Sequence, residues 1–150
     1  MWRWCVEKSS LGSSSITMLV IRFISGLTDE VWRGVIKYLV AVENVSICGC
    51  NEIRYLWESE EEASKFLVNI KELAIYECSN LVSLGEKEEE NNIGSNFLSS
   101  LWMLEVSNCN NMKRCCCPNS IESLDIHYCN SLTNVSFSTK VTGGCSSHLE

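Results

Sequence analysis

The sequence predicts an α/β fold in which short parallel strands stack beside an irregular layer of helices and loops. Three observations support this prediction. One spacing pattern of apolar residues occurs five times in the 150 residues, four of the five copies place a cysteine at the same position, and two of the intervening segments have helical periodicity. One copy cannot bury its apolar face alone, so the copies must stack into a continuous core.

Each copy reads apolar-x-x-apolar-x-apolar-x-x-Cys-x-x-apolar, and the copies begin at Ile16, Val42, Ile70, Leu101 and Ile121. The first copy has Ile24 where the others have cysteine. A short strand followed by Asn or Cys at a fixed offset is the signature of leucine-rich repeats. The predicted architecture is therefore a leucine-rich-repeat solenoid, with a short parallel sheet on the concave face and an irregular convex side.

The centre of each copy alternates apolar, variable, apolar, which is the period of a strand with one buried face. Five parallel strands are expected near Leu19–Ile21, Val45–Ile47, Leu73–Ile75, Leu104–Val106 and Leu124–Ile126. The cysteine follows where the chain turns away from the strand. There a small thiol can be buried near the amides of the turn, so we expect these cysteines to be buried and reduced.

The convex segments differ in length, because the copies are separated by 26, 28, 31 and 20 residues. A helix is expected within Thr28–Leu39, capped by Thr28 or Asp29, and another within Ser59–Asn69. Gly85–Asn96 reads as an acidic loop, and the last, 20-residue step leaves room for little more than loop. In that step Cys115 fills an apolar position, and the next two cysteines read as turn residues.

The positions of the repeats divide the chain into an unassigned N-terminal segment (1–15), a repeat domain (16–137) and a Gly/Ser-rich tail (138–150). The most apolar stretch, 16–27, is too short to span a membrane and contains Arg22. Without a preceding repeat, this stretch is expected to present an open strand edge.

Composition excludes some functions. A net charge of −7 and a pI near 4.9 argue against a nucleic-acid groove, which needs clustered Lys and Arg. The acidic runs Glu58–Glu62 and Glu86–Glu90 read as solvated convex loops, with an acidic docking site as the alternative. The repeat position explains four of the ten cysteines without disulfides. A reducing, cytoplasmic location is therefore expected.

Residues with reactive side chains form no recognisable constellation. Three adjacent thiols at Cys115–Cys117 cannot all face one metal ion, and no Cys-x-x-Cys pair is present. The only histidines are His127, predicted on the concave face, and His148 in the tail. No hydrolase, metalloprotease or phosphate-loop motif occurs. We therefore expect no enzymatic activity, no metal and no cofactor.

The amino-acid sequence of four segments, 27–39, 50–59, 78–90 and 117–129, resembles the C-terminal repeats of plant intracellular immune receptors. These receptors form the nucleotide-binding leucine-rich-repeat disease-resistance family. The resemblance implies a role in defence and a protein ligand: a pathogen effector, a guarded host protein, or the receptor's own nucleotide-binding domain. The family's signalling and nucleotide-switch domains are absent from this sequence, so the resemblance implies a fragment or truncated paralogue. The alternative is the substrate-recognition array of an F-box ubiquitin-ligase subunit, which is expected to have an upstream F-box and more uniform repeats.

A recognition surface is expected at the outward positions of the strands. The candidate residues are Arg22, Phe23, Ser46, Tyr76, Glu77, Glu105, Asn108, Asp125, His127 and Tyr128. Phe23, Tyr76 and Tyr128 are the expected anchors, since aromatic residues are enriched among interface hot spots. The alternative for the charged positions is a plain surface network of Arg22 with Glu77 and Glu105. No nucleic-acid or membrane partner is expected.

Overall fold

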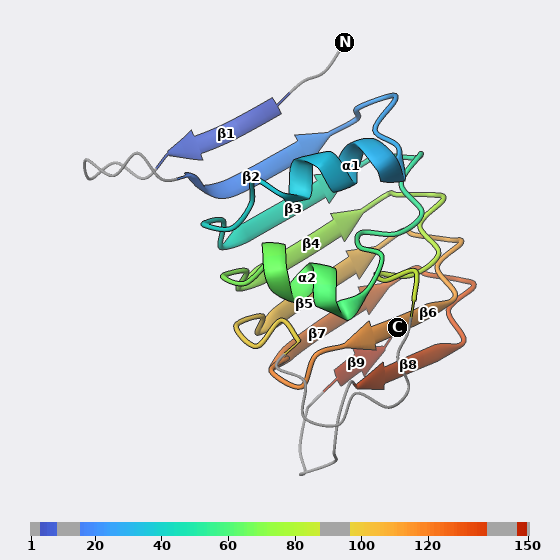
Figure 1. Ribbon diagram of the computed structural model, residues 1–150. Helices are drawn as coiled ribbons and strands as arrows, with labels where there is room; N and C mark the ends of the chain where they lie inside the picture. The colour runs from blue at the N-terminus through green and yellow to red at the C-terminus, as the bar shows by residue number, and fades with distance from the viewer. Residues whose placement is uncertain (1–3, 9–15, 88–96, 138–146, 150) are drawn as a thin grey trace.

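A computed structural model describes residues 4–8, 16–87, 97–137 and 147–149. The chain forms two layers, a seven-stranded sheet and a layer of helices, loops and two short strands (Figure 1). The strand order in the sheet is β1-β2-β3-β4-β5-β7-β9. These strands are β1 (Trp4–Lys8), β2 (Ile16–Arg22), β3 (Asn44–Cys48), β4 (Glu72–Tyr76), β5 (Met103–Ser107), β7 (Ser123–His127) and β9 (Ser147–Leu149).

The five predicted strands are confirmed as β2, β3, β4, β5 and β7, and all four pairings among them are parallel. Each predicted three-residue core lies inside its observed strand, and the copies are in one register. The first residues of the five cores pair in sequence: Leu19, Val45, Leu73, Leu104 and Leu124. The fixed apolar spacing therefore sets the strand register.

The second layer covers one face of the sheet. It contains α1 (Asp29–Ile36), α2 (Glu60–Phe66) and a parallel pair of strands, β6 (Arg114–Cys117) and β8 (Asn134–Phe137) (Figure 1). Both predicted helices are present. Thr28 is the N-cap of α1, and its Oγ1 accepts a hydrogen bond of 3.3 Å from the Val31 amide.

The core lies between the two layers. The inward apolar residues of β2, β3, β4, β5 and β7 are at most 4 % exposed. They contact Trp32 and Ile36 of α1 and Ala63 of α2 within one hydrophobic cluster. The Trp32 indole donates a hydrogen bond of 2.8 Å to the Leu56 carbonyl, so this large ring is buried with its polar atom satisfied.

The repeated cysteines have a common local structure. In Cys50, Cys78, Cys109 and Cys129 the thiol donates to the backbone carbonyl two residues earlier, with Sγ–O distances of 3.4 to 3.6 Å. All four are free thiols, as predicted. The first three are buried, but Cys129 is only half-buried, because it belongs to the last of the five copies.

The prediction that Cys116 and Cys117 are turn residues is wrong, because both belong to β6. In this strand alternate side chains face the core, so Cys115 and Cys117 are fully buried with their sulfur atoms 3.6 Å apart. The expected loop of the 20-residue step is therefore partly a strand, and this strand pairs in parallel with β8.

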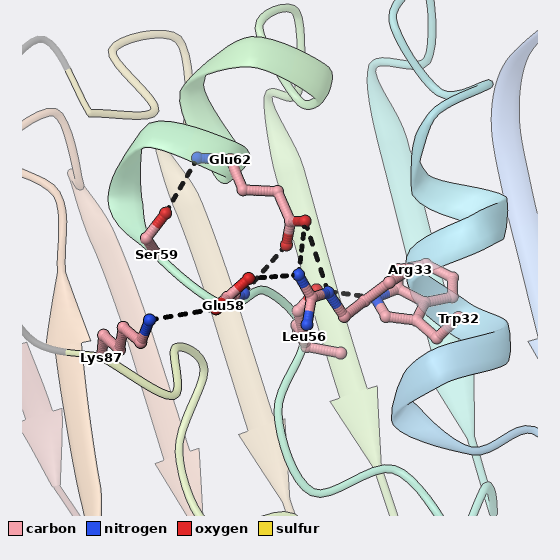
Figure 2. A network of polar contacts seen from close by, with 7 residues as sticks. All are labelled: Trp32, Arg33, Leu56, Glu58, Ser59, Glu62 and Lys87. Carbon is pink, nitrogen blue, oxygen red and sulfur yellow. Dashed lines mark hydrogen bonds and ion pairs between the residues drawn. The ribbon is translucent and has the colours of Figure 1, made fainter.

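The acidic run Glu58–Glu62 is not a solvated loop. It leads into the first turn of α2, where Glu60 is buried and Ser59 caps the helix. Arg33 of α1 contacts the Glu58 and Glu62 carboxylates at 2.6 and 2.9 Å, and Lys87 contacts Glu58 at 3.0 Å (Figure 2). Part of the second run, Glu88–Glu90, lies outside the described residues, as does most of the predicted acidic loop.

Two strands of the sheet lie outside the predicted repeats. β1 pairs antiparallel with β2, so the expected open edge at segment 16–27 is occupied by another strand. At the other end β9, from the Gly/Ser-rich tail, pairs in parallel with β7.

Candidate functional site

The candidate site is the outward face of the sheet, defined as the face turned away from α1 and α2. Strand register arranges its side chains in rows, because register partners point to the same side. The central row consists of Val20, Ser46, Ala74, Glu105 and Asp125. The next row, at the strand ends, consists of Arg22, Cys48, Tyr76, Ser107 and His127. All the inward partners are apolar, whereas these two rows differ in chemistry from strand to strand.

A further row follows the strands at a shared turn. Its members have left-handed backbones with φ between 52° and 66°: Phe23, Gly49, Glu77, Asn108 and Tyr128. In the first four, the amide donates to the carbonyl that ends the next strand, with N–O distances of 2.8 to 3.0 Å. These hydrogen bonds fix the turn against the neighbouring copy. Four of its five residues carry a side chain in a conformation that favours glycine.

The aromatic members of this turn row are strongly exposed. Phe23 and Tyr128 are each 68 % exposed. The Phe23 ring lies against Gly49 of the next copy, where a Cβ would overlap the ring. The Tyr128 ring lies 6.2 Å from the His127 ring, centre to centre. The turn row thus presents an aromatic surface to solvent near each of its ends.

Tyr76 lies half-buried between these ends. Its hydroxyl donates a hydrogen bond of 2.8 Å to the Glu105 carboxylate on the neighbouring strand. Burial and this carboxylate raise the pKa of Tyr76 to about 12. The phenol is therefore a fixed donor at neutral pH, and it holds Glu105 in place.

The part of the outward face from β4 to β7 is acidic. Glu105 and Asp125 are register partners on β5 and β7, and Glu77 lies in the turn after β4. His127 Nε2 lies 2.7 Å from the Asp125 carboxylate. Among the described residues no lysine or arginine forms an ion pair with these three carboxylates, so Arg22 makes no ion pair with Glu77 or Glu105, which was the alternative for the charged positions.

All ten predicted site residues lie on this face or in its turn row. The structure adds Glu72 to this face. Its carboxylate accepts a hydrogen bond of 2.8 Å from the side-chain nitrogen of Asn44, when the Asn44 amide is oriented so that its nitrogen faces the acceptors around it. Glu72 was missed because β3, β4, β5 and β7 are five residues long rather than three, which creates another outward row at their beginnings. The same alternation of inward and outward residues, extended beyond each end of the three-residue core, identifies Glu72 as an outward residue.

A hollow lies on the helix side, with a volume of about 760 Å³. Asp29 lines it and accepts hydrogen bonds from the Arg54 and Tyr55 amides. Arg33 and Glu62, also in the lining, bind each other. Much of its charge is thus internally paired. No group of three or more potential metal ligands occurs within the described ranges.

Comparison with protein-family models, with curated proteins and with solved structures gives no match. In the part of the chain that the structure describes, no helix is long and apolar enough to cross a membrane.

Proposed function

We propose that this chain is a non-catalytic leucine-rich-repeat module that binds a protein ligand through its outward face, as the recognition end of a plant intracellular immune receptor does. The observation that carries the proposal is the single register of β2, β3, β4, β5 and β7. Inward positions keep one chemistry, which maintains the scaffold, while the outward rows differ from strand to strand. That division is typical of repeat proteins that use a sheet as a binding surface.

The turn row gives independent support. A left-handed backbone costs a residue with a side chain about 1–2 kcal/mol relative to the right-handed one, and glycine avoids that cost. Phe23 and Tyr128 nevertheless occupy this row and remain 68 % exposed. Strained backbone conformations that a fold retains cluster at active sites and ligand-binding segments. A role in binding explains why these side chains are present where the fold favours glycine.

Recognition in defence rests on the resemblance of segments 27–39, 50–59, 78–90 and 117–129 to the plant receptor family. The resemblance favours a pathogen effector, a guarded host protein or the receptor's own nucleotide-binding domain as the ligand, all met in the cytoplasm. The acidic outward face supports a protein ligand rather than a nucleic acid, because phosphate backbones require basic surfaces.

The test is capture of partners from plant extract by the immobilised chain and by the double variant Tyr76→Ala/Tyr128→Ala. Tyr38→Ala is the matched control, because Tyr38 is 86 % exposed and follows α1 on the other side of the sheet. We expect the double variant to lose the captured partner and the control to retain it, with unchanged circular dichroism for both. Equal recovery by a folded double variant would reject the outward face.

The absence of catalysis is tested separately. Substrate-panel assays should give no turnover that depends on Cys116 or His127. Turnover that disappears in Cys116→Ser or His127→Gln would overturn the non-catalytic part of the proposal and leave the capture result independent of it.

A further inference from the structure

We propose that the partner contacts this face with an extended, basic segment of about six residues, with an apolar side chain at each end, that crosses the strands from β2 to β7. This inference rests on the proposed function and adds the chemistry of the partner. Three features of the outward face carry it: its concentrated negative charge, the spacing of its exposed aromatic residues, and the fixed position of one carboxylate.

The negative charge is concentrated on two neighbouring strands, β5 and β7, and in the turn after β4. Glu105 and Asp125 are direct register partners, and like charges on directly opposed residues destabilise a sheet. Glu77 adds a third carboxylate in the turn row. Within the described residues its carboxylate contacts the Cys48 thiol, 3.8 Å from Oε2, rather than a cation. Lysine or arginine from a partner would relieve this repulsion, whereas an acidic partner would increase it.

The exposed aromatic residues set the length of the segment. Phe23 follows β2 and Tyr128 follows β7, so four interstrand steps separate their turns. At about 4.8 Å per step the separation is about 19 Å, which an extended chain of about six residues covers. The two 68 % exposed side chains therefore suit the two ends of such a segment. Glu77 lies between them in the turn row, and Glu105 and Asp125 lie on β5 and β7, in the half of the face nearer Tyr128.

One carboxylate is already oriented. The Tyr76 hydroxyl holds Glu105 at 2.8 Å and leaves the remaining acceptor capacity of that carboxylate for a partner. Pre-positioned acceptors lose less side-chain entropy on binding. A bare metal ion fits less well, because no group of three potential ligands converges within the described ranges.

The experiment measures fluorescence anisotropy of labelled peptides of about six residues on the full chain. The probe has phenylalanine and tyrosine at its ends and only Lys or Arg between them. One comparison peptide has glutamate at the basic positions, and another has alanine at both ends. We expect only the basic peptide with aromatic ends to bind well, and its affinity to fall at least about tenfold as salt rises from roughly 0.05 M to 0.5 M.

The variant Glu105→Gln/Asp125→Asn removes two charges from the face and should weaken peptide binding about threefold to tenfold. Glu30→Gln/Glu61→Gln is the matched control, since both of these exposed carboxylates lie on the helix side. It changes net charge equally and should leave binding unchanged. The face variant also weakens the contacts of Glu105 with Tyr76 and of Asp125 with His127, so its circular dichroism must match that of the parent.

Equal binding of the glutamate peptide, or an equal loss in the helix-side control, would overturn the inference. If extract capture depends on Tyr76 and Tyr128 while the basic peptide does not bind, only this inference fails. If the peptide binds as expected but extract capture is unaffected by those tyrosines, the proposed function fails instead.

Discussion

The ring of Phe23 lies so close to Gly49, its counterpart in the next copy, that any side chain at Gly49 would overlap it. Gly49 also has φ of +66°, where an L side chain is strained. The turn at Gly49 is thus coupled to the preceding copy by this contact and to the following copy by its amide, which donates a hydrogen bond of 2.9 Å to the Tyr76 carbonyl.

We therefore expect Gly49→Ala to lower the free energy of unfolding by about 1–2 kcal/mol. Gly34→Ala is the control with the opposite sign. Gly34 is exposed in α1, and no side chain or neighbouring segment lies within 4 Å of the position that an added methyl group would occupy. Alanine there should stabilise the helix by about 1 kcal/mol. Urea unfolding measures both, and stabilisation by Gly49→Ala would contradict the coupling.

Tyr76 makes stability depend on alkaline pH. Its pKa is raised to about 12, against about 10 in an unfolded chain, so the folded state favours the protonated phenol. This contribution is fully present below about pH 10 and is lost as pH rises from about 10 to about 12. Tyr76→Phe should remove that part of the pH dependence of the melting temperature. An unchanged alkaline profile in this variant would contradict the assignment.

Cys129 should be the most reactive thiol of the four repeated cysteines. Its pKa is lowered, chiefly by the neighbouring Cys109 thiol, whereas burial raises the pKa of Cys50 and Cys78. Cys129 is also half-buried where the other three are buried. Its alkylation rate should be half-maximal below pH ~8.5, the value of a free thiol. Peptide mapping after brief iodoacetamide treatment measures this, and earlier labelling of Cys50 or Cys78 would contradict it.

The ion pairs that involve Glu62 and Glu58 should contribute unequally to stability. Glu62 binds Arg33 at 2.9 Å and accepts a hydrogen bond of 2.9 Å from the Glu58 amide, and its side chain is 16 % exposed (Figure 2). Glu62→Gln should therefore cost about 1 kcal/mol in thermal or urea unfolding. Lys87→Ala removes an exposed pair with Glu58 and should have almost no effect. Equal losses would show that the distinction by burial is wrong.

Substitution of Tyr128 should change stability and partner binding in opposite directions. Its φ of 54° favours glycine, and its side chain is 68 % exposed. Tyr128→Gly should therefore raise the free energy of unfolding by about 0.5 kcal/mol, the strain relieved less the added entropy of the unfolded chain. The same variant should weaken capture of the partner. Asn108→Gly, at the equivalent turn, is the control and should change binding less.

The sequence alone determined the strand positions and their register. Apolar residues at fixed spacing identify which side chains face the core, and five copies of one spacing leave one common register, as the paired Leu19, Val45 and Leu73 illustrate. Helix periodicity and the Thr28 cap likewise depend on residues within one turn of each other. Such local patterns are readable because side-chain direction follows directly from backbone period.

Only the tertiary structure decided how distant segments pair. Residues 114–117 carry no apolar alternation that identifies a strand, yet they form β6 because segment 134–137 lies beside them. The segments that form β1 and β9 contain no copy of the repeat and add strands at the two ends of the sheet. Segment Glu58–Glu62 leads into the first turn of α2 with two of its carboxylates in ion pairs, because Arg33 of α1 contacts Glu58 and Glu62. Backbone pairing and ion pairing depend on which segments meet in space, and residue spacing within one segment cannot specify that.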